Sequence, residues 1–258
     1  MNSQNTNMYN GIGQSAKLIR SSKSGVILSG AGISTPSGIP DFRSPGSGLW
    51  SRYNPMEVAS LSAFRYNPEK VYNWLRPLAK KLTNAKPNPA HYAVAHLEKI
   101  GYIKTVITQN IDGLHHRAGS LHVLEVHGSL QTMTCISCYQ QQPVEQFVRP
   151  YIDHGEIPRC PGCNSILKPD IVLFEEQLPY HIWNQARQAT ESCDLMIVTG
   201  SSLEVVPVAG LPMRAIENSA RLIVVNETPT YIDSRADAVL RGDVAEILPL
   251  IVAEVNDE

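Results

Sequence analysis

The sequence predicts an α/β fold built on a parallel sheet, with a second and smaller lobe inserted into it. Short apolar runs rich in Val and Ile recur along the chain, at residues 25–29, 103–108, 122–126, 195–199, 221–225 and 238–240. Stretches with helical character separate them, at residues 68–82, 89–100, 178–192 and 208–218. Apolar runs of this length suit strands covered on both faces, and their alternation with helices favours parallel pairing.

Two segments interrupt this alternation. Residues 44–87 contain Pro and aromatic residues, and residues 128–170 contain four of the five cysteines. We interpret both as insertions that form the small lobe, which leaves residues 11–43, 88–127 and 171–258 as a discontinuous large domain. A chain of 258 residues has room for two lobes, because domains cluster near about 100 to 150 residues. The first ten or so residues are expected to be mobile.

The charge balance limits the classes of partner. The 22 basic and 24 acidic residues give a formal net charge of −2, which offers no electrostatic reason to bind a polyanion. Nucleic acid is therefore not expected as a partner. The polar N-terminus lacks the basic and apolar regions of a signal peptide, and no apolar run approaches the ~20 residues of a membrane span. We expect a soluble, cytoplasmic protein without a membrane partner.

A glycine-containing turn follows the first predicted strand. Gly30 and Gly32 come directly after residues 25–29, and this spacing lets the backbone turn tightly and approach a pyrophosphate. The third glycine of the G-x-G-x-x-G dehydrogenase pattern is replaced by Thr35, and no lone acidic residue stands about 20 positions further on. The turn predicts a dinucleotide site whose chemistry is not simple hydride transfer.

Two Cys-x-x-Cys pairs predict a metal site. Cys135 and Cys138 precede a 21-residue segment, and Cys160 and Cys163 follow it. Paired thiolates of this kind wrap around one tetrahedral zinc ion, and a closed set of four fits a structural role. Two disulfides or free thiols are the alternative, which the expected reducing compartment disfavours. Cys193 stands alone and is interpreted as a small buried apolar residue.

Polar residues follow four of the predicted strands. Asn110 and Asp112 come after residues 103–108, and His127 follows residues 122–126. Serines and an asparagine follow the later strands, at Ser201, Ser202 and Asn226. Each has a structural alternative: an Asx-rich turn capping the next helix, or a histidine satisfied within the fold. Because the carboxyl ends of parallel strands meet at one edge of the sheet, together they predict a ligand crevice.

These motifs resemble the sirtuins, the Sir2 family of NAD-dependent protein lysine deacylases, in a bacterial-type form. The match covers roughly residues 22–250. It is carried by both cysteine pairs and by GAGISTPSGIPDFR (30–43), TQNIDGLH (108–115), VHG (126–128), GSSLEVVP (200–207) and VVN (224–226). The resemblance implies a Rossmann-like, doubly wound, NAD-binding large domain. It also implies a helical module (44–87) and a zinc-binding module (128–170), which form the small domain.

The resemblance further implies a reaction and its residues. The acyl group of N6-acyl-lysine in a protein or peptide would pass to ADP-ribose, with release of nicotinamide and O-acyl-ADP-ribose. His127 would be the general base, and Phe42 would shield the ribose after nicotinamide leaves. The implied cofactor contacts are Gly30, Ala31, Gly32, Ser34, Asp41, Phe42, Arg43, Gln109, Asn110, Ile111, Asp112, Gly200, Ser201, Ser202, Asn226, Glu227 and Val244.

The chain departs from the family pattern at the peptide groove. A Phe-Gly-Glu stretch usually follows the zinc module, whereas here Glu175 stands in place of the glycine, between Phe174 and Glu176. Strand addition uses main-chain groups, so we expect peptide binding to survive this change. The added charge predicts a shift of preference toward basic peptides.

A second departure concerns the acyl group. Sirtuins that remove succinyl or malonyl groups have a Tyr-x-x-Arg pair in the helical module, and an ungapped alignment puts Leu75 and Leu78 at those positions. Without a cation to pair with an acyl carboxylate, acidic acyl groups should be disfavoured, and acetyl or longer fatty acyl chains favoured. Arg76 lies between the two leucines and is the competing candidate for such a cation.

Other functions fit parts of the same pattern. A protein mono-ADP-ribosyltransferase would consume NAD but leave a protein adduct, and an NAD-binding module without turnover would release no nicotinamide. A zinc-ribbon interaction or nucleic-acid protein agrees less well with the acidic balance and the four convergent strand ends.

Overall fold

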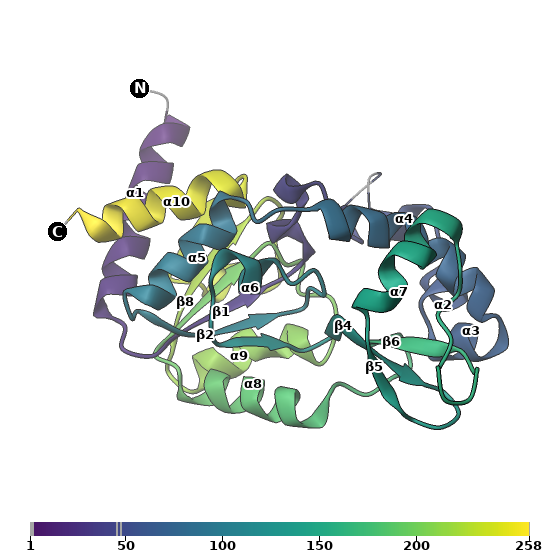
Figure 1. Cartoon of the computed structure of the whole chain (residues 1–258). Coiled ribbons are helices and arrows are strands. Elements are labelled where there is room, and N and C mark those ends of the chain that lie inside the picture. Colours follow the sequence, from purple (N-terminus) through teal and green to yellow (C-terminus); the bar gives the residue numbers. More distant parts are fainter. Residues whose placement is uncertain (1–2, 45, 47, 258) are drawn as a thin grey trace.

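The computed structural model describes residues 3–44, 46 and 48–257, and it contains two sheets of different size (Figure 1). The large sheet has six strands in the order β3-β2-β1-β7-β8-β9, and every neighbouring pair is parallel. Its strands are β1 (Gly25–Ser29), β2 (Ile103–Thr108), β3 (Val123–Glu125), β7 (Leu195–Thr199), β8 (Arg221–Asn226) and β9 (Ala238–Arg241). The predicted parallel α/β fold is confirmed.

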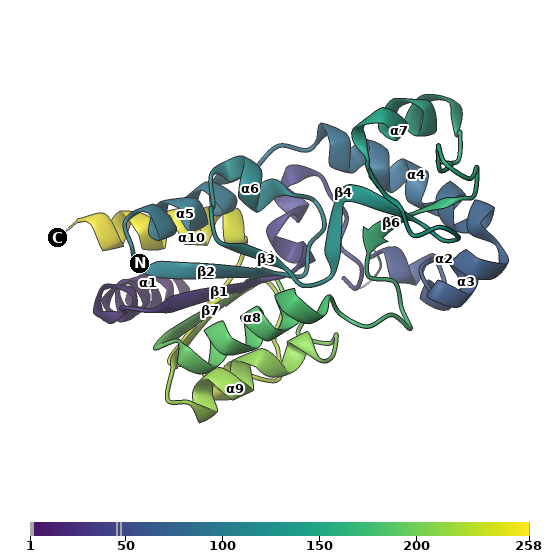
Figure 2. The ribbon, with the colours of Figure 1, turned by 60° about the horizontal axis from the view of Figure 1, so that its bottom comes forward.

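Helices cover both faces of this sheet (Figure 2). One face carries α1 (Ser3–Ser21), α5 (Pro89–Lys99) and α10 (Val244–Asn256), and the other carries α8 (Tyr180–Ser192) and α9 (Leu211–Glu217). The strand side chains divide accordingly, since Ile27 packs under the first group of helices and Val26 and Leu28 under the second. This alternation is what a strand buried on both faces requires.

The small lobe combines the two inserted segments. The second insertion forms an antiparallel sheet in the order β5-β4-β6 and a short helical stretch. The first insertion supplies the helices beside it. Their bounds are β4 (Gly128–Cys135), β5 (Gln141–Pro143), β6 (Leu167–Ile171), α2 (Pro55–Val58), α3 (Leu61–Tyr66), α4 (Pro68–Asn84) and α7 (Glu145–Arg149), with a π-helical turn at Pro150–His154.

The two insertions share one core. Tyr72 of α4 donates its hydroxyl hydrogen to the main-chain oxygen of Leu167 in β6, and Tyr151 donates to the main-chain oxygen of Tyr72. These rings pack edge-on with centroids 5.2 Å apart, and Phe64 lies beside Tyr72. Burial raises the pKa of both tyrosines, so the hydroxyls stay protonated as donors. We propose the domain division of the sequence analysis for the folded chain, with both modules forming one small domain.

The first ten residues, expected to be mobile, are helical from Ser3 onward, because α1 begins there. Ile12, Ala16 and Ile19 are spaced at three and four residues, and their buried side chains pack in the core beside α10 and β9. The helix is held by this packing, which helical spacing alone allows but does not fix.

The remaining helices follow local capping chemistry. Asn88 accepts a hydrogen bond from the backbone of α5, and Asp243 does the same for α10 at 2.8 Å from the Ala245 nitrogen. α6 (Leu114–Ala118) ends at Gly119 in the left-handed region. The side chains of Asn88 and Asp243 satisfy free N–H groups in the first turns of their helices, and Gly119 ends α6. Within the described part of the chain, no helix combines the length and the apolar character needed to cross a bilayer.

Candidate functional site

The candidate site lies where the large sheet changes its winding direction. Strands β1 and β7 are neighbours, and the chain leaves them at Gly30 and Gly200. The Gly32 nitrogen donates to the Gly200 oxygen at 2.8 Å, and a Cβ added at Gly32 would lie 2.8 Å from that same oxygen. Glycine is required here because the two turns touch backbone to backbone. A crevice at this position is where open α/β sheets bind ligands.

A cavity of ≈ 1330 Å³ opens from this point toward the small lobe. It exceeds the roughly 300 to 1,000 Å³ of a typical small-molecule site, so a dinucleotide and a second reactant fit together. His127 and every residue expected to contact the cofactor line it: Gly30, Ala31, Gly32, Ser34, Asp41, Phe42, Arg43, Gln109, Asn110, Ile111, Asp112, Gly200, Ser201, Ser202, Asn226, Glu227 and Val244. The structure thus gathers the whole predicted set around one space, while their roles stay predictions.

One hydrogen-bonded chain links the ends of three strands. Gln109, after β2, donates through Nε2 to Ser201 Oγ at 2.9 Å. Ser201, after β7, donates its backbone N–H to Asn226 Oδ1 at 3.0 Å, and Asn226 Nδ2 donates back to the Ser201 oxygen at 2.7 Å. Asn226 is the last residue of β8 and is buried. These amides therefore hold the loops that line the cavity at fixed distances from one another.

A second network lies beneath the Gly30 turn. Asn110 Nδ2 donates to the Gly30 oxygen at 3.0 Å and contacts Ser34 Oγ at 3.1 Å, and Ser34 donates to Asp112 Oδ2 at 2.7 Å. Burial raises the pKa of Asp112, while the Leu114 N–H and the Ser34 hydroxyl oppose that shift. Asp112 Oδ1 also accepts a hydrogen bond from the Leu114 N–H at the start of α6. One of its two carboxylate oxygens therefore caps the helix, as the structural alternative predicts.

Two buried histidines behind this network were not found from the sequence. His91 and His115 pack with ring centroids 5.0 Å apart, and His115 Nε2 lies 2.9 Å from Ser29 Oγ. Burial lowers the pKa of His91 to about 4 and that of His115 to about 3, so both rings are neutral near pH 7. His91 stands three residues after Asn88 and completes a capping box on α5. That spacing indicates the cap, but not the contact with His115.

His127 follows β3 and faces the cavity with a defined tautomer. Its Nδ1 lies 3.1 Å from the main-chain oxygen of Gln109, which can only accept, so Nδ1 carries the hydrogen and Nε2 is the basic nitrogen. Desolvation is the largest effect on the pKa of His127 and lowers it, and the nearby Arg43 cation lowers it further. The bond to Gln109 acts in the opposite direction. The ring is therefore neutral near pH 7 and available as a base.

The loop after the Gly30 turn is held by its own side chains. Asp41 accepts hydrogen bonds from the backbone of Arg43 and from the backbone and hydroxyl of Ser44, at 3.1, 2.8 and 2.5 Å. Its carboxylate thus shapes the loop that carries Phe42 and Arg43. Arg43 Nε lies 3.2 Å from Glu204 Oε2. Glu204 belongs to the loop after β7, so this ion pair joins the two loops that line the cavity. Glu204 is a cavity residue that the sequence analysis did not single out.

The end of the cavity nearest the small lobe is apolar. The Trp50 ring packs on Phe42, Trp74 and Phe174, with centroids 5.1, 5.7 and 6.0 Å apart. Leu75 and Leu78 of α4 are buried and line this end as well. Further lining residues missed by sequence reasoning are Ile39, Leu82, Ile171, Val172, Leu173, Leu178, Trp183, Val205 and Val206. Spacing on one helix predicts its apolar face, but not which cavity that face lines.

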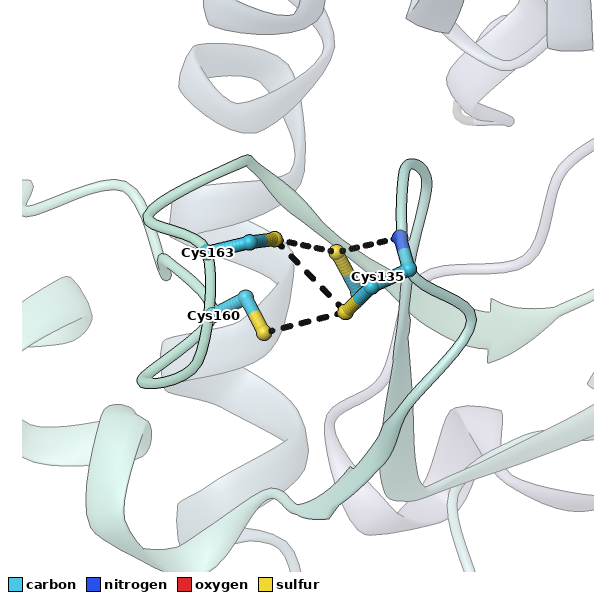
Figure 3. A group of neighbouring side chains, drawn as sticks. Cys135, Cys160 and Cys163 are labelled. Atoms are coloured by element: carbon cyan, nitrogen blue, oxygen red, sulfur yellow. Dashed lines mark hydrogen bonds between the residues drawn. The ribbon is translucent and has the colours of Figure 1, made fainter.

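The four paired cysteines converge as predicted (Figure 3). Their Sγ atoms all lie within 4.8 Å of one another, with Cys135 and Cys163 3.4 Å apart and Cys138 and Cys160 3.6 Å apart. A tetrahedral zinc ion with Zn–S bonds of ~2.3 Å needs sulfurs about 3.8 Å apart, so the set fits zinc. Sulfurs in a disulfide would be about 2.05 Å apart, and none of these cysteines forms a disulfide. The four thiolates complete the coordination shell, which suits a structural ion.

Cys193 is buried, as expected. Desolvation raises the pKa of its thiol to about 11. A thiol that stays protonated is a poor nucleophile, which agrees with a packing role.

Comparison with known proteins places this geometry in a family. The model described as "Sir2 family" matches residues 30–207. The NAD-dependent protein deacylase 2 of Archaeoglobus fulgidus is 46% identical over 250 residues, which is 96% of this chain and 98% of that protein. The NAD-dependent protein deacetylase of Sulfolobus acidocaldarius is 45% identical over 244 residues, covering 93% of this chain and 94% of that protein.

Solved structures agree with these relatives. One from a study of the mechanism and regulation of Sir2 enzymes superposes with a TM-score of 0.90 at 45% identity, covering 95% of this chain and 98% of that one. Sir2Af2 bound to a myristoylated histone peptide gives 0.83 at 40%, covering 96% and 97%. A Sir2 homologue–NAD complex gives 0.85 at 42%, covering 93% and 92%. With the cysteine cluster, the glycine turns and His127 arranged as described, the chain belongs to the Sir2 family of enzymes.

Proposed function

We propose that this chain is an NAD-dependent protein lysine deacylase that transfers the acyl group of N6-acyl-lysine to ADP-ribose and releases nicotinamide. The observation that carries the proposal is the single cavity in which a neutral His127 stands between glycine turns suited to a pyrophosphate and an apolar end suited to an acyl chain. The relatives named deacylases and deacetylases support the same activity.

The cofactor end of the cavity has the residues suited to hold NAD. The turns at Gly30 and Gly200 and the amides of Gln109 and Asn226 would hold NAD, which supplies the ADP-ribose that accepts the acyl group. Their hydrogen bonds to one another keep them in place before NAD arrives. Holding the two reactants in contact, and apart from water, is the main contribution such a site makes to the rate.

His127 would take a proton from a ribose hydroxyl. Gln109 fixes the Nδ1 hydrogen and leaves Nε2 free, so the base is oriented as well as deprotonated. When bound, NAD would supply the acceptor ribose: its bond to nicotinamide would break as the acyl oxygen bonds to the anomeric carbon, the deprotonated hydroxyl would bond to the acyl carbon, and one water molecule would release the lysine amine. Phe42, which packs against Trp50 with its ring tilted, would shield the ribose from water after nicotinamide leaves.

We further propose that the enzyme prefers neutral acyl groups. Leu75 and Leu78 offer no charge to an acyl carboxylate. Arg76, the competing candidate, does not line the cavity, because its guanidinium donates to the main-chain oxygens of Ile152 at 3.0 Å and Asp153 at 2.9 Å. Acetyl and longer fatty acyl groups fit this wall, whereas succinyl and malonyl groups would lose their hydration without gaining a partner.

The proposed setting is the cytoplasm, with acyl-lysine proteins as partners and neither nucleic acid nor membrane. The net charge of −2 and the four-thiolate site, which needs a reducing compartment, support this setting.

Mass spectrometry of the products tests the activity. The protein is incubated with NAD and acetyl-, butyryl-, myristoyl- and succinyl-lysine peptides, beside His127→Ala and the control His122→Ala, whose exposed ring pairs with Glu98 outside the cavity. We expect O-acyl-ADP-ribose from the neutral peptides, its loss in His127→Ala, and its retention in the control. A protein adduct instead of free product would indicate ADP-ribosyl transfer, and NAD left intact with every peptide would indicate a binding module.

A further inference from the structure

The segment that follows β6 borders the peptide side of the cavity and contains an unusual backbone position. Residues 172–176 line the cavity, and Glu175 adopts φ 74°, in the left-handed region that glycine prefers. A glutamate held there without compensation would be strained. Contacts of the Glu175 side chain must therefore compensate for the backbone strain.

The backbone of this segment is already joined to the helical module. Phe174 donates its N–H to the Ala59 oxygen at 2.9 Å and accepts the Leu61 N–H at 2.9 Å, so Ser60 and Phe174 form a parallel bridge. α3 begins directly after this bridge, at Leu61. The helical module is thus joined to the segment after β6 through one pair of main-chain hydrogen bonds.

The Glu175 side chain extends this junction. Its Oε2 accepts the backbone N–H of Ser62, in the first turn of α3, at 2.8 Å. The Ser62 side chain lowers the pKa of Glu175 most, the hydrogen bond from the Ser62 backbone N–H lowers it next, and Arg65 of the same helix adds to the shift. The Glu175 carboxylate is therefore already paired with groups of α3. It is less available to attract the basic peptides that the sequence alone predicts.

The next residue ties the other end of the segment. Glu176 Oε2 accepts the Leu173 N–H at 2.8 Å and pairs with Lys168 Nζ at 3.1 Å, so the second carboxylate is also used within the protein. Among the contacts of the described residues, the main-chain N–H and C=O of Glu175 itself have no partner. One main-chain unit with free hydrogen-bonding groups therefore lies between two tethered neighbours, where it can pair with the main chain of a bound peptide.

We propose that Glu175 is a positioning residue whose carboxylate clamps residues 172–176 onto α3, so that the free main-chain groups of Glu175 meet an acyl-lysine peptide in a fixed place. The peptide part of this inference rests on the proposed deacylase function. The clamp itself is a property of the free protein and can be measured without turnover.

Two variants separate clamping from charge recognition. Glu175→Gln keeps an oxygen that accepts the Ser62 N–H but removes the charge, whereas Glu175→Ala removes both. The matched control is Glu57→Ala, which breaks an exposed ion pair with Lys70 in the same helical module. Hydrogen exchange over residues 61–66 reports on the clamp, and steady-state kinetics with a neutral and a basic acetyl-lysine peptide report on peptide positioning.

We expect Glu175→Ala to exchange Ser62 about five- to tenfold faster than the wild type, as for loss of a helix cap. The KM for both peptides should rise by a similar factor, with kcat nearly unchanged because the NAD end of the cavity is untouched. Glu175→Gln should stay within about twofold of the wild type in both measurements. The control should leave Ser62 exchange and both KM values unchanged.

Three results would overturn the proposal. Unchanged Ser62 exchange in Glu175→Ala would mean that no clamp exists, whether or not the protein is active. Faster exchange with unchanged KM values would mean that the clamp does not position the peptide. A KM rise confined to the basic peptide, and equal in the two variants, would assign Glu175 to charge recognition instead. A wild type that turns over no peptide refutes the proposed function, while the exchange data still decide the clamp.

Discussion

Replacing Gly32 by alanine tests whether the contact between the two glycine turns sets the cofactor site. The added Cβ would lie 2.8 Å from the Gly200 oxygen and 2.9 Å from its Cα, and both obstacles are backbone atoms. Reaching an ordinary contact of 3.4 Å requires the turns to separate by about 0.6 Å, since a close-packed interior has no space to absorb the methyl group. The hydrogen bond from Gly32 to Gly200, now 2.8 Å, would be lost or strongly weakened.

The separation has a cost in stability and a cost in binding. Overpacking of this kind lowers the free energy of unfolding by about 1–3 kcal/mol, which in a chain of this size lowers Tm by about 2–12 °C. Both turns line the cofactor end of the cavity, so NAD would lose well-placed main-chain contacts, and a loss of about 1.4 kcal/mol is a factor of ten in Kd. We therefore expect the Kd for NAD to rise about tenfold in Gly32→Ala.

The assay is calorimetric titration of NAD beside thermal unfolding and peptide turnover. Gly210→Ala is the matched control, because Gly210 has φ −81° and an added Cβ would meet no atom within 4 Å. This control should bind NAD as the wild type does and gain about 0.4–1 kcal/mol in stability from a stiffer unfolded chain. Wild-type NAD affinity and Tm in Gly32→Ala would refute the reasoning.

Four further predictions concern pH, metal and acyl choice. The acid limb of kcat/KM should lie below pH 6.5, because burial lowers the pKa of His127; a limb above 6.5 would contradict this. His91 and His115 are neutral when folded and must bind protons on unfolding below pH 6.5. The free energy of unfolding should therefore fall by up to about 1.4 kcal/mol per pH unit per histidine between 6.5 and 4, in denaturant titrations at each pH. Cys163→Ser should lower zinc content and unfold the small domain, raising the peptide KM while calorimetry still detects NAD binding. Leu78→Arg should raise the ratio of succinyl to acetyl turnover at least about tenfold, and an unchanged ratio would mean that this wall does not meet the acyl group.

Local patterns in the chain determined the scaffold. Each predicted strand of the large sheet lies within one residue of its observed bounds. The central strands β1 and β7 are buried throughout and apolar up to their last residues, and small or polar residues follow their ends. The spacing of the two cysteine pairs predicted that they lie together, since one zinc ion needs all four thiolates as ligands. The family motifs likewise named side chains that all reach one cavity.

Other features depend on contacts between segments far apart in the chain. α1 is held by the face it shares with α10, and the burial that keeps His91 and His115 neutral comes from packing one helix on another. Glu175 shows the largest difference between the sequence prediction and the structure. Its sequence position predicts a free charge beside the peptide, whereas the fold places Ser62, more than 100 residues earlier in the chain, where it donates to that carboxylate. Sequence therefore determined what is fixed by local periodicity and ligand chemistry. Only the tertiary structure decided which groups are desolvated and which charges are already paired, because burial and pairing are properties of neighbours that no spacing along the chain specifies.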